Sequence, residues 1–391
     1  MNRRDNPYTP GAGRKPAVLA GRDVDLQDFQ LLIDRLSDGR YERSFVFSGL
    51  RGVGKTVLLL ELDVMAREAG WASTDVQEVG SQHDFRSSFA RMASRVLRSM
   101  SLKARMKDRA LRALGVVKAF SASVPGGVKL QVDVDAVVGV ADTGDIEEDL
   151  TDLMIEIGDV AVAGRSGALF LIDEMQNLDD RSLAAICMAF HRLSQKNLPV
   201  ALAAAGLPTL RPALHRARPY ASRLFGYRDV GSLPAPAATA ALVTPAARHD
   251  VQFHEEAAEL VVRESGGYPY YLQEYGRVLW DEVDESPIAV GDVQRVHDIV
   301  QDSLDASFFG PQFDLATDAE QRYLLALSRL GEGPYSTSEA AREAGYGSVS
   351  GASFVREGLV KKELIWSPRR GQIDFTVPRF ARHLRATQEG A

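Results

Sequence analysis

The sequence predicts an α/β protein with a parallel-sheet core, a helical region after it and a C-terminal winged-helix domain. Three observations support this prediction. A glycine-rich loop at residues 49–56 joins a β-branched and aromatic run to a helix-forming run, and the apolar run 167–172 ends in two acids. The C-terminal part combines three helix patterns with a hairpin pattern.

The loop at residues 49–56 fits the pattern G-x-x-x-x-G-K-[ST] without a mismatch. Its glycines let backbone N–H groups approach a polyphosphate, and the positive end of the next helix attracts the same anion. Lys55 is expected to reach the β- and γ-phosphates, and the Thr56 hydroxyl to hold Mg²⁺. The residues predicted to contact ATP here are Gly49, Leu50, Arg51, Gly52, Val53, Gly54, Lys55, Thr56 and Val57. The alternative is a chance glycine-rich turn, but strand, loop and helix all agree with the motif.

Composition limits the class of protein. The chain has 391 residues, 45% apolar and 25% charged, which suits two or three globular domains. The net charge of −7 means that any affinity for nucleic acid must come from local patches. The one cysteine, Cys187, excludes an internal disulfide and a cysteine metal cluster, and is expected to be buried. Without a secretory pattern or an apolar run long enough for a bilayer, we expect a soluble cytoplasmic protein with no membrane partner.

We expect five segments along the chain. Residues 1–16 are predicted to form a loose basic arm, 17–231 the core with an insertion at about 82–145, 232–311 a helical lid, and 312–391 the winged helix. An amphipathic helix begins near residue 23 and is either a cover over the nucleotide base or a helix packed on the sheet edge.

The insertion carries an unusual charge pattern. Between residues 85 and 121 there are ten basic residues and one acid, Asp108. Arg91, Arg95 and Arg98 share one helix face, which is a phosphate-backbone contact, a solvated face, or a partner for the acidic helix beginning near residue 145. An alternating segment at 128–134 predicts a strand in a hairpin.

The run at 167–172 predicts a buried parallel strand whose end carries two acids. Asp173 is expected to hold Mg²⁺ through its coordination shell, and Glu174 to activate the attacking water. The next strand, 199–205, ends at Gly206, which offers no polar side chain; Thr209 is a weak substitute and is better explained as a turn residue. Among the arginines that follow, Arg223 is the candidate for stabilising transition-state charge, with a surface arginine as the alternative.

The remaining motifs concern the lid and the C-terminal domain. Pro269 follows a helix break and is predicted to pack on adenine, or to form an ordinary corner between helices. Capping-box patterns start at Thr317 and Ser336, and a third helix is expected over about 350–357. Arg369 and Arg370 lie at the tip of the predicted hairpin. From residue 356 onward, eight basic residues and four acids give a local charge of +4, which is compatible with contact to duplex DNA.

Taken together, Gly21-Arg22, residues 49–56, residues 171–176, residues 222–225, Gly267-Tyr268-Pro269 and the terminal winged helix resemble a known set of motifs. They are similar to the AAA+/STAND branch of P-loop ATPases, close to initiator-type (origin-recognition) and archaeal-type ATPases. The resemblance implies a core ATPase domain, a lid and a winged helix, with Gly21, Arg22 and Pro269 around the nucleotide. Two departures are the missing polar residue at Gly206 and the missing arginine after Gly267.

Three hypotheses follow. The first is a slow Mg²⁺-dependent ATPase in which ATP binding and hydrolysis switch the conformation of the winged helix. The second is a DNA-binding, initiator-like regulator in which the nucleotide is structural. The third is a STAND-like signalling or defence ATPase that self-associates on ATP, although the sequence shows no sensor repeats or effector domain.

Overall fold

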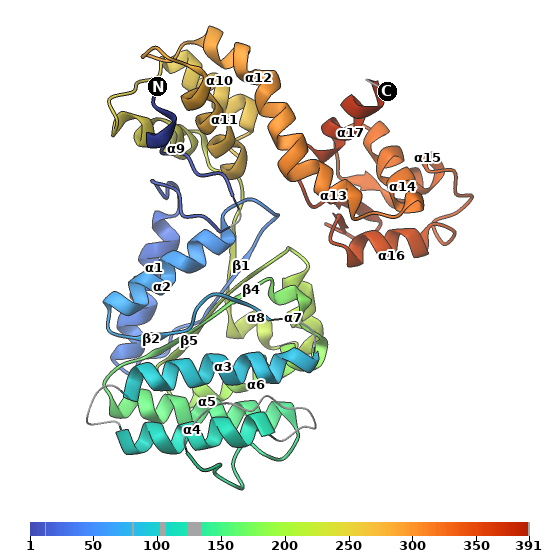
Figure 1. Ribbon diagram of the computed structural model, residues 1–391. Coiled ribbons are helices and arrows are strands. Elements are labelled where there is room, and N and C mark those ends of the chain that lie inside the picture. Colours follow the sequence, from blue (N-terminus) through green and yellow to red (C-terminus); the bar gives the residue numbers. More distant parts are fainter. Residues whose placement is uncertain (12, 80–81, 102–106, 123–133, 390–391) are drawn as a thin grey trace. The chain divides into compact units, whose positions relative to one another are not determined.

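The computed structural model describes residues 1–11, 13–79, 82–101, 107–122 and 134–389 (Figure 1). The chain divides into two compact units. The core unit comprises Arg22–Gly49 and Lys55–Val230, and the second unit comprises Met1–Gly21, Leu50–Gly54 and Gly231–Ala391. Within the described ranges, no helix combines the length and apolar character that a membrane span requires.

The core unit is built on a six-stranded sheet with the order β2-β4-β5-β1-β6, in which β3 also pairs with β4. All of these strand pairs are parallel, as the sequence predicts. The two long strands β4 and β5 are buried along their whole length, because helices cover parallel sheets on both faces. The strands are β1 (Phe45–Ser48), β2 (Ala72–Ser73), β3 (Gln77–Glu78), β4 (Ala168–Asp173), β5 (Val200–Gly206) and β6 (Gly226–Asp229).

Helices follow most of these strands. α2 follows the phosphate loop, and Gly70, at a φ of 78°, comes just after its end. α5 is capped by Asp145, whose carboxylate accepts a hydrogen bond from Glu147 N at 2.8 Å. The helices of this unit are α1 (Asp23–Ser37), α2 (Lys55–Glu68), α3 (Gln82–Ser101), α4 (Lys107–Ala122), α5 (Ile146–Ala163), η3 (Met175–Asn177), α6 (Asp180–Gln195), α7 (Leu210–Ala217) and α8 (Ala221–Leu224).

The insertion contains α3 and α4, which lie alongside α5 as a stack of helices (Figure 1). The apolar side of α3 is buried, and the ring of Phe89 stacks on Phe170 of β4 with centroids 5.2 Å apart. The strand expected at 128–134 falls almost entirely on residues outside the described ranges. The insertion is therefore part of the core packing of this unit.

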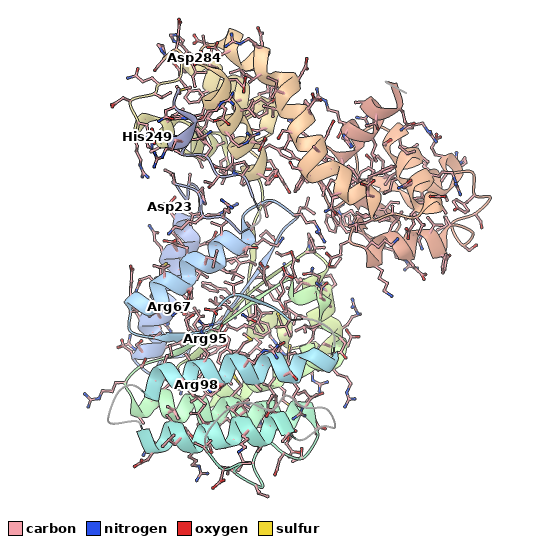
Figure 2. All side chains as sticks on the ribbon, viewed as in Figure 1. Asp23, Arg67, Arg95, Arg98, His249 and Asp284 are labelled. Carbon is pink, nitrogen blue, oxygen red and sulfur yellow. The ribbon has the colours of Figure 1, made fainter. Side chains whose placement is uncertain are left out.

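The basic residues of the insertion have two different environments. Arg91, Arg95 and Arg98 are exposed on α3, and Figure 2 shows the last two projecting from it. Arg86 is instead buried, and its guanidinium donates to Asp149 of α5 at 2.8 Å. Arg112 lies 3.5 Å from Glu156 of the same helix. Arg86 and Arg112 therefore partner the acidic helix, whereas Arg95 on the exposed face of α3 pairs with Asp75.

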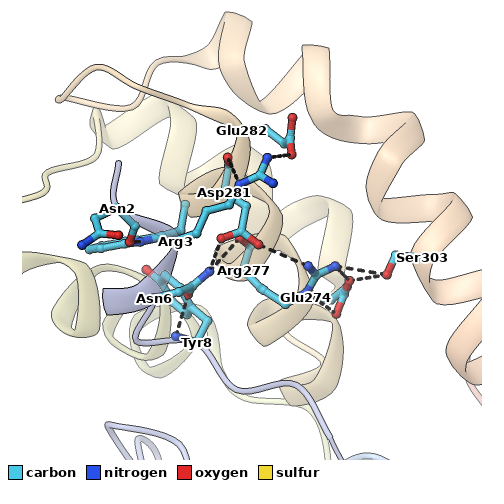
Figure 3. A network of polar contacts seen from close by, with 10 residues as sticks. Asn2, Arg3, Asn6, Tyr8, Glu274, Arg277, Asp281, Glu282 and Ser303 are labelled. Carbon is cyan, nitrogen blue, oxygen red and sulfur yellow. Dashed lines mark hydrogen bonds and ion pairs between the residues drawn. The ribbon is translucent and has the colours of Figure 1, made fainter.

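The second unit begins with the N-terminal segment. Residues 1–16 were expected to be loose, but the segment up to residue 9 is held against α11 (Pro269–Glu282) (Figure 3). Asn6 Nδ2 donates to Asp281 at 2.9 Å, and the buried Tyr8 hydroxyl donates to the carbonyl of Leu242 at 2.5 Å. A Cβ at Gly276 would lie 2.4 Å from the Tyr8 ring. The glycine therefore allows the ring to pack directly on the helix backbone.

The rest of the second unit consists of two groups of elements. The first group contains α9 (Ala235–Ala247), α10 (Glu255–Ser265), α11, α12 (Val290–Leu304), η4 (Asp305–Phe309) and α13 (Gly310–Asp314). The second contains α14 (Asp318–Arg329), β7 (Tyr335–Ser336), α15 (Thr337–Glu343), α16 (Ser353–Lys361), β8 (Ile365–Trp366), β9 (Gln372–Phe375) and α17 (Phe380–Glu389). β7, β9 and β8 form a three-stranded antiparallel sheet in that order.

Two sequence predictions in the C-terminal group are corrected. The third helix was expected over about 350–357, ending before Gly358, yet α16 continues to Lys361. A Cβ at Gly358 would lie 2.2 Å from Glu320 Oε1, so the glycine serves close packing against α14 and does not end the helix. The capping box at Thr317 is present, whereas Ser336 makes no side-chain capping bond because its hydroxyl bonds Ser338 at 2.8 Å.

Candidate functional site

The phosphate loop leaves the sheet at the end of β1. Gly49 N donates to the carbonyl of Gly206 at the end of β5, at 3.1 Å. Lys55 opens α2, is only 5% exposed, and its Nζ donates to the carbonyl of Gly49 at 3.0 Å. Gly52 and Gly54 have φ angles of 76° and 91°, a region that residues with a Cβ rarely adopt. The loop thus has the backbone conformation that its glycines predict.

Thr56 and Asp173 come together as the sequence predicts for a metal site. Thr56 Oγ1 donates to Asp173 Oδ2 at 2.5 Å, although the two residues are 117 positions apart. Asp173 is 3% exposed at the end of β4. A hydroxyl and a carboxylate are hard oxygen ligands, and Mg²⁺ commonly takes one or two such protein ligands together with waters and substrate phosphates. The donor set therefore fits Mg²⁺.

Glu174 follows directly at the carboxyl edge of the sheet. Its backbone is left-handed, with a φ of 46°, which is uncommon for a residue with a side chain. Glu174 N donates to Asp173 Oδ1 at 2.9 Å. The bond ties the turn to the same carboxylate that Thr56 contacts. Backbone strain of this kind is concentrated at functional sites, where the surrounding contacts hold it in place.

The sequence prediction gave no role to Gln176, which contacts Glu174. Gln176 Nε2 donates to Glu174 Oε2 at 2.7 Å, and Leu207 N donates to Gln176 Oε1 at 3.0 Å. The side chain thus joins the turn after β4 to the turn after β5. Its presence two residues after Glu174 was visible in the sequence, but only the pairing of β4 with β5 brings it to Gly206.

The arginines after β5 are distributed over several environments. Arg223 is exposed on α8. Arg211 lies over the Tyr227 ring, 4.8 Å from its centroid, and Arg218 pairs with Glu147 of α5. Thr209 precedes α7 without a side-chain capping bond, in agreement with its interpretation as a turn residue. The role of Arg223 in charge stabilisation stays a prediction.

Three residues were expected around the nucleotide base: Gly21, Arg22 and Pro269. Gly21 has a φ of 69°, and a Cβ there would lie 2.8 Å from Ala237 Cβ. Arg22 is 8% exposed, and burial lowers its pKa against the opposing effect of Asp25. Pro269 opens α11 directly after Gly267 and Tyr268, as predicted for a proline in a first helical turn. Contact of these residues with a nucleotide stays a prediction.

The environment of Cys187 excludes this residue as a nucleophile. It is fully buried in α6, and burial raises the pKa of its thiol to about 12. Because a thiolate is required for nucleophilic attack, Cys187 is structural, as the sequence predicts. Among the described residues, no group of three or more histidine, cysteine, aspartate or glutamate side chains is arranged to hold a metal ion.

A phosphate loop and a buried carboxylate at the carboxyl edge of a parallel sheet define a P-loop nucleoside-triphosphate hydrolase. Residues 18–202 match the family described as AAA ATPase domain, and this match supports an AAA+ P-loop ATPase. Residues 306–384 match a second family, described as a domain of unknown function (DUF8462). No curated protein sequence matches the chain.

Several solved structures are similar to the chain at low sequence identity. The Walker-type ATPase of Pyrococcus abyssi is 14% identical with a TM-score of 0.50, over 92% of this chain and 95% of that one. The RuvB Holliday junction branch migration motor of Thermotoga maritima is 16% identical with a TM-score of 0.44, over 95% and 98%. The Orc1 protein of Aeropyrum pernix in complex with DNA is 15% identical with a TM-score of 0.43, over 96% and 94%.

Proposed function

We propose that the protein is a slow Mg²⁺-dependent ATPase that acts as a nucleotide-driven conformational switch. The observation that carries this proposal is the convergence of Thr56, Asp173 and Glu174 beside Lys55. Lys55 is proposed to bind the β- and γ-phosphates, and Thr56 and Asp173 to hold Mg²⁺. When bound, the ion neutralises charge that develops on the phosphate oxygens.

The proposed reaction is hydrolysis of the terminal phosphoanhydride of ATP. The oxygen of a water molecule attacks the γ-phosphorus, and the bond from that phosphorus to the β–γ bridging oxygen breaks. Glu174 accepts the proton that the water loses, and ADP and inorganic phosphate leave. Arg223 is proposed to offset the developing negative charge, in the same chain or in a second copy.

Two features support a slow rate and a switching role. The end of β5 is Gly206, which offers no polar side chain to the γ-phosphate, and Gly267 is followed by Tyr268 and not by an arginine. The ATPases that the sequence resembles have a polar residue at the first position, and initiator-type members have an arginine at the second. Without them, long occupancy by one nucleotide is expected, which suits a switch better than a motor.

The proposal is tested by steady-state ATP hydrolysis with Mg²⁺. The wild type should release phosphate, and Glu174→Gln should bind ATP but lose turnover, because an amide cannot accept the proton. Lys55→Ala should lose ATP binding. Equal ATP affinity for the wild type and Lys55→Ala would contradict the assigned site. Turnover that survives in Glu174→Gln would contradict the role of Glu174.

A second candidate function is binding of duplex DNA by the C-terminal group, which we propose to be a winged helix. Arg369 and Arg370 are exposed in the turn between β8 and β9, and Lys361 is exposed on α16. Such residues suit phosphate contacts made by a wing and a neighbouring helix. Duplex affinity should fall with salt, and each phosphate contact that Arg369→Ala or Arg370→Ala removes should reduce the salt slope by about one. Absence of duplex binding at low salt would reject this function.

A further inference from the structure

The side chain of Gln176 occupies the space beside Gly206 at the end of β5. A Cβ built on Gly206 would lie 2.5 Å from Gln176 Oε1 and 2.8 Å from Leu210 Cδ2. No real Cβ approaches another heavy atom so closely. Glycine at position 206 therefore leaves room for the Gln176 side chain. The turn after β4 fills the space that a side chain at the end of β5 would otherwise occupy.

Two hydrogen bonds determine the orientation of the Gln176 amide. A backbone N–H can only donate, so the atom facing Leu207 N, at 3.0 Å, must be the amide oxygen. The Glu174 carboxylate can only accept when ionised, so the atom facing its Oε2, at 2.7 Å, must be the amide nitrogen. The two requirements agree, and a flipped amide would lose both bonds.

The bridge that Gln176 forms between Glu174 and Leu207 completes a series of polar contacts around the end of the sheet. Lys55 donates to Gly49 O, and Gly49 N donates to Gly206 O. On the other side, Thr56 donates to Asp173, whose other carboxylate oxygen accepts from Glu174 N. Gln176 joins these two branches, because it contacts both Leu207, next to Gly206, and the Glu174 side chain.

We propose that Gln176 is the positioning residue of the hydrolytic carboxylate of Glu174, and that its side chain fills the space beside Gly206 at the end of β5 for this purpose. This inference rests on the proposed ATPase function. The amide holds Glu174 Oε2 and leaves Oε1 to accept the proton of the attacking water. It also couples the position of the β5 end, and through Gly49 the base of the phosphate loop, to the orientation of Glu174.

The turnover test uses Gln176→Ala and Gln176→Glu, with Asn177→Ala as the matched control. Asn177 is the next residue of η3 and is exposed. Both Gln176 variants should keep ATP affinity within about twofold and lose about ten- to a hundredfold in kcat, because a misplaced catalytic group costs rate more than binding. Gln176→Glu has the shape of glutamine but, when ionised, cannot donate to Glu174. Wild-type kcat in either variant would overturn the inference.

A second test measures amide hydrogen exchange of Leu207 without nucleotide. Gln176→Ala removes the acceptor of this N–H, so exchange at Leu207 should become faster, while Asn177→Ala should leave it unchanged. Unchanged exchange in Gln176→Ala would overturn the bridge whether or not the protein hydrolyses ATP. Absence of turnover in the wild type would reject the proposed function, whereas an active wild type with an equally active Gln176→Ala would reject only the inference.

A third test uses the glycine. Gly206→Ala places a Cβ against Gln176 Oε1 and should displace the amide, lowering kcat in the wild-type background. In the Gln176→Ala background the same substitution should lower kcat by a smaller factor, because the amide is already absent. Equal loss in both backgrounds would mean that Gly206 acts only through its contact with Leu210, and would contradict the proposed pairing.

Discussion

At the scale of single residues, the site depends on short polar contacts between side chains that are distant in sequence. The Thr56 hydroxyl is the clearest example, since its hydrogen bond to Asp173 holds both groups at the place where Mg²⁺ is proposed to bind. A hydroxyl in the first turn of a helix is by itself a modest metal ligand. Its value to the site comes from its fixed position beside a buried carboxylate.

The first prediction separates the hydroxyl of Thr56 from its shape. Thr56→Val keeps the branched side chain but loses the oxygen, and should lower Mg²⁺-dependent ATP hydrolysis by at least about tenfold, since the ion is held less well. Thr56→Ser keeps the oxygen and should remain within a few-fold of the wild type. Hydrolysis rates over a Mg²⁺ titration give the comparison. Equal rates for Thr56→Val and Thr56→Ser would exclude the hydroxyl as a metal ligand.

At the scale of elements, the contact of α14 with α16 shows how a buried charge is accommodated. Glu320 is 6% exposed and accepts a hydrogen bond from Lys362 Nζ at 2.6 Å. It also accepts from Thr317 N at 2.7 Å in the capping box. Burial alone would raise the pKa of Glu320, but the hydrogen bonds from Lys362 and Thr317 outweigh it and lower the pKa below its ordinary value.

The second prediction concerns acid stability. A carboxylate whose pKa is lowered in the folded state stabilises that state above its unfolded pKa of about 4.3 and ceases to do so as the pH falls through the folded value. Lys362→Met should therefore reduce the local stability of α14 and α16 by about 1–2 kcal/mol at pH 7. The difference from the wild type should shrink as the pH falls below about 4.

Hydrogen exchange of the backbone amides of α14 and α16 at several pH values measures this local stability. Lys361→Met is the control, because Lys361 is exposed and precedes Lys362 directly. An equal loss of protection in both lysine variants would show that the effect is general charge removal. A difference from the wild type that stays constant from pH 7 to pH 3 would contradict the role of Glu320.

At the scale of the whole molecule, the sequence predicts features that local motifs encode. It does not predict close contacts between residues that are distant in sequence. The phosphate loop, the buried strand ending at Asp173 and the Thr317 cap are local patterns, and the structure contains all three. Gly358 looked like a helix end because glycine often ends helices, yet it marks a close contact with Glu320. The sequence also assigned no role to Gln176, because its hydrogen-bond partner Leu207 is 31 residues away.

The last prediction tests whether the chain responds to nucleotide as a switch. If the proposed site binds ATP in the folded chain and not in the unfolded chain, ATP with Mg²⁺ at a hundred times its Kd should stabilise the folded state by about 2.7 kcal/mol. Hydrogen exchange should slow in β4 and β5 of the wild type and of Glu174→Gln, but not of Lys55→Ala. A switch requires a second change: protection must also differ between the ATP and ADP states within residues 318–389, because a ligand shifts a conformational equilibrium only through different affinities for its states. Changes confined to Arg22–Gly49 and Lys55–Val230 would leave an ATPase without the switch, since hydrolysis would then have no consequence beyond the unit that performs it.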